Sequence, residues 1–304
     1  MKFFLMERFS FYLESIKNMQ QIILMKNRYN YVYILGENMA KVEIYILTHK
    51  KFNEEYDSSI YKPLLVGSEK INEDYGYIKD NTGDNISNLN PYFAELTGEY
   101  WAWKNSKTDI VGFCHYRRWF VKNLKYEKLT KTEIINDLND YDIILPQKSI
   151  LSRTIYNTIK NRLKTSPDYG PKIEDYDKLA NVIKEKFPEY YDVFMDVMHG
   201  KEAYEQNMFI CNKKLSDKYL EWLFEVLNTV RSEIDLNTYA EDNKRVFGFM
   251  SELLLNVYAK KHELKIKEHY LYVNERKFPI VNIIGRRFPR FRNLENRLSV
   301  YGLF

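Results

Sequence analysis

The sequence has little of what several classes of protein require. Its 304 residues include only two cysteines, Cys114 and Cys211, each within an apolar run, so a disulfide framework is excluded and both are expected to be reduced core residues. No apolar stretch reaches transmembrane length. Glu7, Arg8 and Glu14 interrupt the N-terminal apolar residues, so we expect no signal peptide. A net charge of +4 is too small to indicate nucleic acid binding.

The short motifs of common enzyme classes are also missing. There is no G-x-S-x-G, P-loop, G-x-G-x-x-G or Cys/His zinc spacing, which removes the usual support for a hydrolase, NTPase, dehydrogenase or zinc site. An acidic D-x-D after a central strand would indicate Mn²⁺ or Mg²⁺. Asp140-Tyr141-Asp142 precedes its strand, and Asp175-Tyr176-Asp177 lies in a helical segment, so neither is a convincing metal motif.

Aromatic residues are abundant, with 26 tyrosines. Tyrosine suits a sugar-binding cleft because its ring stacks on C–H bonds and its hydroxyl donates; a biased A/T-rich genome is the alternative explanation. Apolar runs alternate with amphipathic segments, which predicts an α/β domain with a mostly parallel sheet flanked by helices, and a helical annex at about 150–200. We expect an N-terminal extension or upstream start over 1–38, one domain over 39–275 and a C-terminal arm over 276–304. The predicted strands are Val42–Thr48, Leu64–Gly67, Ile110–Cys114, Asp142–Pro146, Met208–Cys211 and Ile266–Val273.

His115-Tyr116-Arg117-Arg118 follows the predicted buried strand Ile110–Cys114. Positive charge where a buried strand ends is costly unless an anion meets it, and in α/β folds ligands bind at that edge. A guanidinium matches phosphate oxygens, so a diphosphate is the expected partner. If the strand continued, His115 and Arg117 would face one side and Tyr116 and Arg118 the other. Internal ion pairs are the structural alternative.

Three other places hold candidate side chains. The loop from Thr82 to Ser87 has short polar residues, and Asn90-Pro91 begins a helix whose N-terminus suits an anion. Glu252, within Gly248-Phe249-Met250-Ser251-Glu252, is a candidate general base, with a helix-start carboxylate paired to Arg245 as the alternative. Asn207 abuts a buried strand and could bind sugar hydroxyls.

The C-terminal arm interleaves basic and aromatic residues. Arg286-Arg287-Phe288-Pro289-Arg290-Phe291-Arg292 is typical of an interfacial membrane anchor, so we expect a peripheral membrane contact through Arg286–Arg292. An arm that packs on its own domain, with a solvated basic face, is the alternative.

Several blocks together resemble a known family. Asp84-Asn85-Ile86-Ser87, Tyr100-Trp101-Ala102-Trp103-Lys104-Asn105 and Gly112-Phe113-Cys114-His115-Tyr116-Arg117-Arg118 occur in that order, followed by Asn207–Ile210 and Gly248–Glu252. The chain is similar, over about 41–275, to bacterial capsular and exopolysaccharide glycosyltransferases long catalogued as a domain of unknown function. The resemblance implies a GT-A-like, Rossmann-related fold in which His-Tyr-Arg replaces the acidic metal motif, and galactose or galactofuranose transfer. Leu253 departs from the family, where Arg often follows Ser-Glu.

The sequence therefore predicts a hexosyltransferase that uses a UDP-sugar and a glycan or lipid-linked glycan acceptor, in the cytoplasm and peripheral on the inner face of the plasma membrane. We expect no required cofactor, with Mn²⁺ or Mg²⁺ as the alternative, and no nucleic acid partner. A non-catalytic sugar-nucleotide-binding or membrane-docking module is the alternative function. The predicted catalytic residues are Glu252, Arg117 and His115. The predicted substrate-binding residues are Thr48, His49, Asp84, Asn85, Ser87, Asn90, Trp103, Lys104, Tyr116, Arg118 and Asn207.

Overall fold

The computed structural model describes residues 40–166, 170–240 and 244–274, together with 283, 284, 286 and 288 of the C-terminal arm. The predicted extension over 1–38 lies outside the described residues, as does most of the arm. The chain divides into two compact units, Met1–Lys41 and Val42–Phe304, and everything below concerns the second unit.

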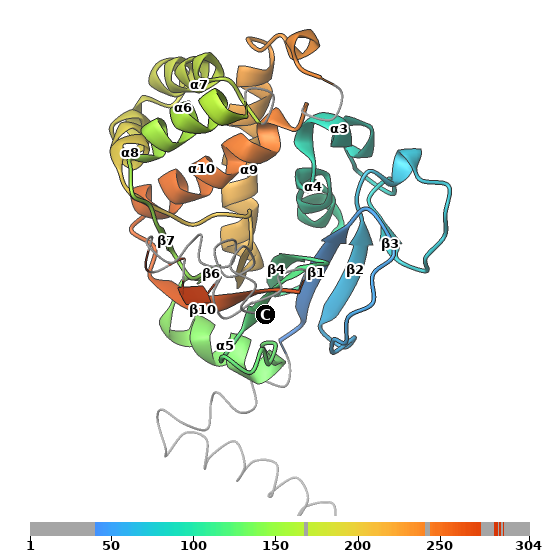
Figure 1. Cartoon of the computed structure of the whole chain (residues 1–304). Coiled ribbons are helices and arrows are strands. Elements are labelled where there is room, and N and C mark those ends of the chain that lie inside the picture. Colours follow the sequence, from blue (N-terminus) through green and yellow to red (C-terminus); the bar gives the residue numbers. More distant parts are fainter. Residues whose placement is uncertain are drawn as a thin grey trace, which may run out of the picture. The chain divides into compact units, whose positions relative to one another are not determined.

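The centre of this unit is an eight-stranded sheet in the order β3-β2-β1-β4-β5-β10-β6-β9, with β4 also paired to β9 (Figure 1). Its strands are β1 (Val42–Thr48), β2 (Tyr61–Leu65), β3 (Ile78–Lys79), β4 (Ile110–His115), β5 (Arg118–Val121), β6 (Ile143–Pro146), β9 (Phe209–Asn212) and β10 (Ile266–Val273). A separate antiparallel pair joins β7 (Ser149–Ile150) to β8 (Glu202–Ala203).

The sheet is mixed, which corrects the expectation of a mostly parallel one. β1 is parallel to β2 and β4, β2 is parallel to β3, and β6 is parallel to β10. β9 runs antiparallel to β4 and β6, and β5 runs antiparallel to β4 and β10. A buried antiparallel strand reads as the same continuous apolar run as a parallel one, so the run Met208–Cys211 did not reveal its direction.

Helices cover both faces of the sheet. Figure 1 shows α3, α4, α9 and α10 on one side and α5 on the other. Helices α6, α7 and α8, which form the predicted annex, pack on one another and on α9 and α10. The helices are α3 (Asn90–Phe93), α4 (Leu96–Asn105), α5 (Lys131–Asp140), α6 (Ile155–Thr165), α7 (Ile173–Lys186), α8 (Pro188–His199), α9 (Lys213–Arg231) and α10 (Val246–Lys261). Short 3₁₀ turns occupy Ser68–Lys70, Ser87–Leu89 and Leu236–Thr238.

The helix predicted from Asn90 onward is broken at Ala94, whose φ of 49° and ψ of −126° are not helical. The sequence predicted that Asn90 caps the helix start, and this prediction is wrong, because Asn90 is the first residue of α3. Its Nδ2 donates to the Ala94 carbonyl oxygen at 2.8 Å and to Thr97 Oγ1 at 3.2 Å. These hydrogen bonds hold the break between α3 and α4. As a result, Glu95 lies at the N-cap of α4 instead of inside a continuous helix.

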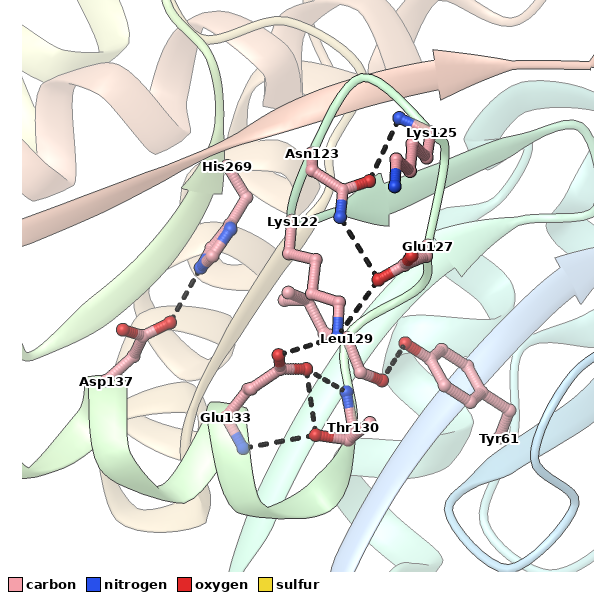
Figure 2. A network of polar contacts seen from close by, with 10 residues as sticks. All are labelled: Tyr61, Lys122, Asn123, Lys125, Glu127, Leu129, Thr130, Glu133, Asp137 and His269. Atoms are coloured by element: carbon pink, nitrogen blue, oxygen red, sulfur yellow. Dashed lines mark hydrogen bonds and ion pairs between the residues drawn. The ribbon is translucent and has the colours of Figure 1, made fainter.

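The connection from β5 to α5 is held by a network of polar contacts shown in Figure 2. Thr130 and Glu133 form a capping box at the start of α5, with Glu133 Oε2 accepting from the Thr130 amide at 2.9 Å. Tyr61 donates to the Leu129 carbonyl oxygen at 2.9 Å, which ties the same connection to β2. These local bonds fix where α5 begins.

Candidate active site

The predicted His-Tyr-Arg-Arg motif forms the tip of a hairpin. β4 ends at His115, Tyr116 and Arg117 make the turn, and β5 begins at Arg118. His115 and Arg118 are a directly paired cross-strand couple, so their side chains face the same side. The strand does not continue through the motif, and the expected pairing of His115 with Arg117 on one face is replaced by His115 with Arg118.

His115 is a buried, neutral hydrogen-bonding group. Its Nε2 lies 2.7 Å from the Gln206 carbonyl oxygen, and because a carbonyl only accepts, Nε2 carries the proton and Nδ1 is the acceptor of the neutral ring. Burial lowers the pKa of His115; Glu95 and the Gln206 hydrogen bond oppose this shift, while Arg118 and Arg117 add to it. The permanent positive charge of the hairpin therefore resides on its arginines.

The loop from Glu205 to Asn207, which precedes β9, crosses the end of β4. Gln206 and Asn207 have φ values of 89° and 50°, an unusual pair of left-handed residues that are not glycine. Asn207 Nδ2 donates to Glu95 Oε1 at 2.8 Å and to the Gly248 carbonyl oxygen at 2.9 Å. Strain of this kind persists only where surrounding contacts hold it, and here they come from β4, α4 and α10.

Glu252 lies well inside α10, half-buried, and not at the helix start beside Arg245. Its pKa is raised to about 8, first by burial and then by the negative charges of Glu95 and Glu205. Arg118 and a hydrogen bond from the Gln206 backbone oppose the shift. A carboxyl group with a pKa close to neutral pH can hold or accept a proton, which suits a general base.

The sequence analysis did not select Glu95 or Glu205 as site residues. Glu95 reaches the site because the chain breaks at Ala94, and Glu205 because it precedes the strained loop. The break also requires a close approach of α10: a Cβ on Gly248 would lie 3.3 Å from the Ala94 Cβ. Glu95-Leu96-Thr97 lies between Asp84–Ser87 and Tyr100–Asn105, two blocks that carry the family resemblance, which is a signal for Glu95; nothing in the sequence distinguishes Glu205 from other glutamates.

The end of β1 lies beside the hairpin, since Leu47 is in register with His115. Tyr116 is surrounded here by the His49 ring at 5.4 Å, the Lys50 Nζ at 5.2 Å and the Arg117 guanidinium at 5.6 Å. Thr48 is buried and its hydroxyl donates to the Lys50 carbonyl oxygen at 2.6 Å, so it shapes this turn. His49, Tyr116 and Arg118 are thus brought together with the catalytic candidates.

The side chains of the predicted binding loop Thr82–Asn90 are mostly engaged in hydrogen bonds within the loop and with α4. Asp84 accepts from the Tyr100 hydroxyl at 3.1 Å, and its backbone is bonded in both directions to the Asn105 side chain. The Asn85 side chain bonds back to the Gly83 carbonyl. Ser87 is buried and donates to Asp80 at 2.5 Å. These side chains, like Asn90, stabilise the loop next to α4.

Trp103 and Lys104 lie in the last turn of α4, away from the hairpin. The Trp103 ring stacks on Phe224 of α9 at 5.8 Å, and the Lys104 Nζ sits 3.3 Å from the centre of the Trp103 ring. The Trp103 carbonyl accepts from Lys213, whose amide bonds to Asp109 just before β4 begins. This pair therefore lies near the start of β4, whereas His115 lies at its end.

No group of three or more His, Cys, Asp or Glu side chains within the described ranges could hold a metal ion. Asp142 accepts from the Lys265 amide at 2.8 Å, and Asp175 accepts from the Tyr239 hydroxyl, so both acidic pairs contain a residue engaged in the fold. Metal dependence stays a prediction.

Arg286 corrects one part of the predicted membrane contact. It is buried, and its Nη1 lies 3.1 Å from Glu205 Oε2 and 3.1 Å from Ser149 Oγ. The first residue of the predicted basic run therefore binds its own domain, while Phe288 is half-exposed and the rest of the run lies outside the described residues. In the part of the chain that is described, no helix combines the length and hydrophobicity needed to cross a bilayer.

The central strands of this mixed α/β domain end in a basic hairpin that lies near several carboxylates, and comparison with known proteins indicates the class of protein that shares this fold. A solved structure titled "WbbM bifunctional glycosytransferase apo structure" is similar to this chain with a TM-score of 0.69 and 31% sequence identity. The match covers 77% of this chain and 45% of that chain, so this chain spans less than half of the larger protein.

The family model of a domain of unknown function, DUF4422, matches residues 43–263, and the chain belongs to this family. No curated protein matches the sequence. The family match includes the hairpin, the strained loop and the part of α10 that carries Glu252. The comparisons therefore support a glycosyltransferase-like family and fold.

Proposed function

We propose that this protein is a glycosyltransferase that moves a hexose, of the galactose or galactofuranose type, from a UDP-sugar to a growing cell-surface glycan. One observation carries the proposal: Arg118, paired with His115 at the end of β4, acts on Glu252, whose pKa of about 8 suits acid–base work. The similarity to a glycosyltransferase fold supports the same class of reaction.

The donor would lie across the ends of β1 and β4. Arg117 and Arg118 are the groups that would bind the diphosphate, because a guanidinium presents a planar set of donors to phosphate oxygens. Tyr116 and His49 beside the turn after β1 provide ring surfaces near that position. As the bond between the sugar C1 and the phosphate oxygen breaks, the arginines would stabilise the charge that develops on the leaving UDP.

Glu252 would act as the general base for the acceptor. The acceptor oxygen forms a bond to C1, the bond from C1 to the UDP oxygen breaks, and the acceptor hydroxyl proton passes to the Glu252 carboxylate. This sequence of events describes an inverting transfer. Asn207 and Glu95, which are bonded to each other beside Glu252, would orient sugar hydroxyls.

We propose that fixed arginine charge replaces a divalent cation in this reaction, with Mn²⁺ or Mg²⁺ as the alternative. Transfer measured after EDTA treatment and again with each cation restored separates the two. Unchanged transfer in EDTA supports the arginine mechanism, whereas loss that Mn²⁺ or Mg²⁺ restores contradicts it.

The acceptor and cellular context follow from the family resemblance. A capsular, exopolysaccharide or lipid-linked glycan at the inner face of the plasma membrane would be extended from the cytoplasm. The described part of the arm leaves Phe288 and Ile284 half-exposed, and these are the apolar side chains it offers to a membrane surface.

A titration with nucleotides and UDP-sugars, followed by a transfer assay with each donor that binds, tests the proposal. We expect a UDP-sugar to bind and to be transferred by the wild-type chain, with transfer reduced at least about 100-fold in Arg118→Ala. Lys104→Ala, in the last turn of α4, is the matched control and should retain both properties. Donor binding without transfer or hydrolysis would favour the non-catalytic binding module instead.

A further inference from the structure

Arg286 is unusual among the cations that the structure describes because it comes from the C-terminal arm and is almost completely buried, with 5% of its surface exposed. Ile283, one turn earlier, is buried as well at 2%, while Ile284 and Phe288 face outward. The described part of the arm therefore places one basic and one apolar side chain against the domain. Burying a guanidinium costs free energy unless the charge is paired, so its partners indicate its role in the fold.

Glu205 and Ser149 are two of the partners of Arg286. Arg286 Nη1 lies 3.1 Å from Glu205 Oε2 and 3.1 Å from Ser149 Oγ, and the Ser149 hydroxyl donates to the same Glu205 oxygen at 2.6 Å. Ser149 is fully buried in β7. One oxygen of Glu205 is thus held from two directions, by a charge and by a hydroxyl, at the point where the strained loop begins.

Residue 206, the neighbour of Glu205, is bonded to both central groups of the site. The Gln206 carbonyl accepts from His115 at 2.7 Å, and its backbone also bonds to Glu252. On the other side of Glu205, Asn256 of α10 bonds to the Tyr204 amide and carbonyl at 2.8 Å each. Any movement of Glu205 therefore changes the position of Gln206, which orients His115 and Glu252.

We propose that Arg286 is a positioning residue, through which the C-terminal arm holds Glu205 in place and offsets its negative charge beside Glu252. This inference rests on the proposed function for its effect on turnover, because Glu252 is the base of that reaction. The charged groups that face Glu252 are Glu95 from the start of α4, Glu205 from the loop and Arg118 from β5, with neutral Tyr176 contributed by α7. Of these, Glu205 is the one whose charge Arg286 directly neutralises.

The pH dependence of transfer distinguishes positioning from simple anchoring. In Arg286→Met the full charge of Glu205 acts on Glu252, so the ascending limb of kcat against pH should move up by about one pH unit. In Glu205→Gln that charge is gone, and the limb should move down by a similar amount. Arg286→Lys keeps a cation and should return the limb close to its wild-type position.

Arg286→Gln is a second variant that removes the charge while keeping a donor for Ser149, and it should shift the limb in the same direction as Arg286→Met. Lys148→Met is the matched control, because Lys148 adjoins β7 and forms an exposed ion pair with Glu202. It removes a nearby cation without touching Glu205, so its limb should not move. If every Arg286 variant loses the same fraction of activity at every pH, the arm only anchors the fold and the proposal is overturned.

A second readout does not depend on turnover. The Glu252 carboxyl can be titrated by ¹³C NMR in the free full-length protein, with its signal assigned by comparison with Glu252→Gln. We expect the same ordering, with the highest pKa in Arg286→Met and the lowest in Glu205→Gln. An NMR shift in a chain that transfers no sugar would support the inference and contradict the proposed function. An active enzyme whose Glu252 titration is unchanged in all these variants would contradict the inference and leave the proposed function supported.

Discussion

Two polar networks in this protein contain similar side chains under opposite conditions. In the network of Figure 2, Glu133 and Glu127 both contact Lys122, at 3.0 Å and 3.2 Å. At the end of β4, Glu95, Glu205 and Glu252 lie close enough for the first two to raise the pKa of the third. In the first arrangement one lysine contacts both carboxylates, whereas in the second two carboxylates act on a third, and Arg118 and Arg286 offset their charge only in part.

The pKa shifts follow this difference. Burial acts to raise the pKa of Glu133, but hydrogen bonds from Thr130 and Lys122 outweigh it and lower the pKa; those from Asn123 and Lys122 lower the pKa of Glu127. Burial and like charge raise the pKa of Glu252 to about 8. Networks that only stabilise a fold satisfy their charges, whereas a site that must move a proton keeps one group near neutrality. The comparison therefore indicates which network carries the chemistry.

The largest effect expected from breaking this contrast is on the rate of transfer. Glu252→Gln removes the proposed proton acceptor with little change in volume, so kcat should fall by roughly 10²–10⁴-fold and the ascending pH limb should disappear. Glu133→Gln, the same substitution in the paired network, should leave kcat within about twofold. Steady-state rates from pH 6 to pH 9 check both, and a Glu252→Gln enzyme with near-normal kcat would show that another group takes the proton.

Asp80 sharpens the comparison because its carboxylate is fully buried and both of its oxygens accept hydrogen bonds. Its two oxygens accept from the Gly67 and Ser68 amides and from the hydroxyls of Ser87 and Thr97, at 2.5–3.0 Å. Asp80→Asn turns one acceptor into a donor that faces other donors, so the free energy of unfolding should fall by about 3 kcal/mol. Urea unfolding measures it.

The control for Asp80 is Asp84→Asn, which alters an exposed carboxylate on the same loop. We expect its free energy of unfolding to change by less than about 0.5 kcal/mol. Equal losses in the two variants would mean that the Asp80 hydrogen bonds contribute little beyond those of the exposed loop.

The two networks should also make opposite contributions to stability as pH changes. The pKa of Glu252 is raised from an ordinary 4.5 to about 8, so the folded protein holds this proton more tightly than the unfolded chain does. The resulting contribution to the free energy of unfolding is complete below pH 4.5 and is lost as the pH rises through 8. The lowered pKa of Glu133 gives the reverse: its contribution is present above pH 4.5 and is lost as the pH falls further.

Thermal unfolding from pH 3 to pH 9 tests these signs. Glu252→Gln should flatten the loss of melting temperature between pH 5 and pH 8.5, and Glu133→Gln should flatten the loss below pH 4.5. A wild-type melting temperature that rises from pH 6 to pH 8 in step with Glu252 would contradict the assignment.

Local features of this fold could be predicted from the sequence more readily than its site. The apolar run Val42–Thr48 matched β1, which is buried except at Glu43, because a buried strand needs nearly continuous apolar residues. Ile266–Val273 matched β10 as well, although only Leu271 of that strand is buried. Strand direction was not predictable from composition, and neither was β5, where Trp119 and Phe120 follow two arginines. Because the chain turns back at Tyr116 and Arg117, Arg118 shares a face with His115, and the prediction that Arg117 does so is wrong.

The site could be predicted from the sequence only in part. His115, Glu252 and Asn207 were selected individually, each beside a buried element, and the structure brings them together. Glu95 was not selected, because it depends on a helix break that Asn90, Ala94 and Gly248 make jointly across distant parts of the chain. Trp103 and Lys104 were selected from their motif, but a motif does not tell at which end of a helix its residues will lie.

The smallest expected effect concerns the paired network alone. Thr130 Oγ1 accepts from the Glu133 amide at 3.3 Å in the capping box that begins α5. Thr130→Ala should lower the free energy of unfolding by about 1 kcal/mol, because it leaves the first turn of the helix without that acceptor. Thr132→Ala, two residues further and exposed, is the matched control and should be neutral or slightly stabilising. Chemical unfolding measures both, and the ascending limb of the transfer rate should stay unchanged in each. A shift of that limb in Thr130→Ala would show that the two networks are coupled through the sheet, and the contrast between a stabilising and a reactive cluster of carboxylates would no longer hold.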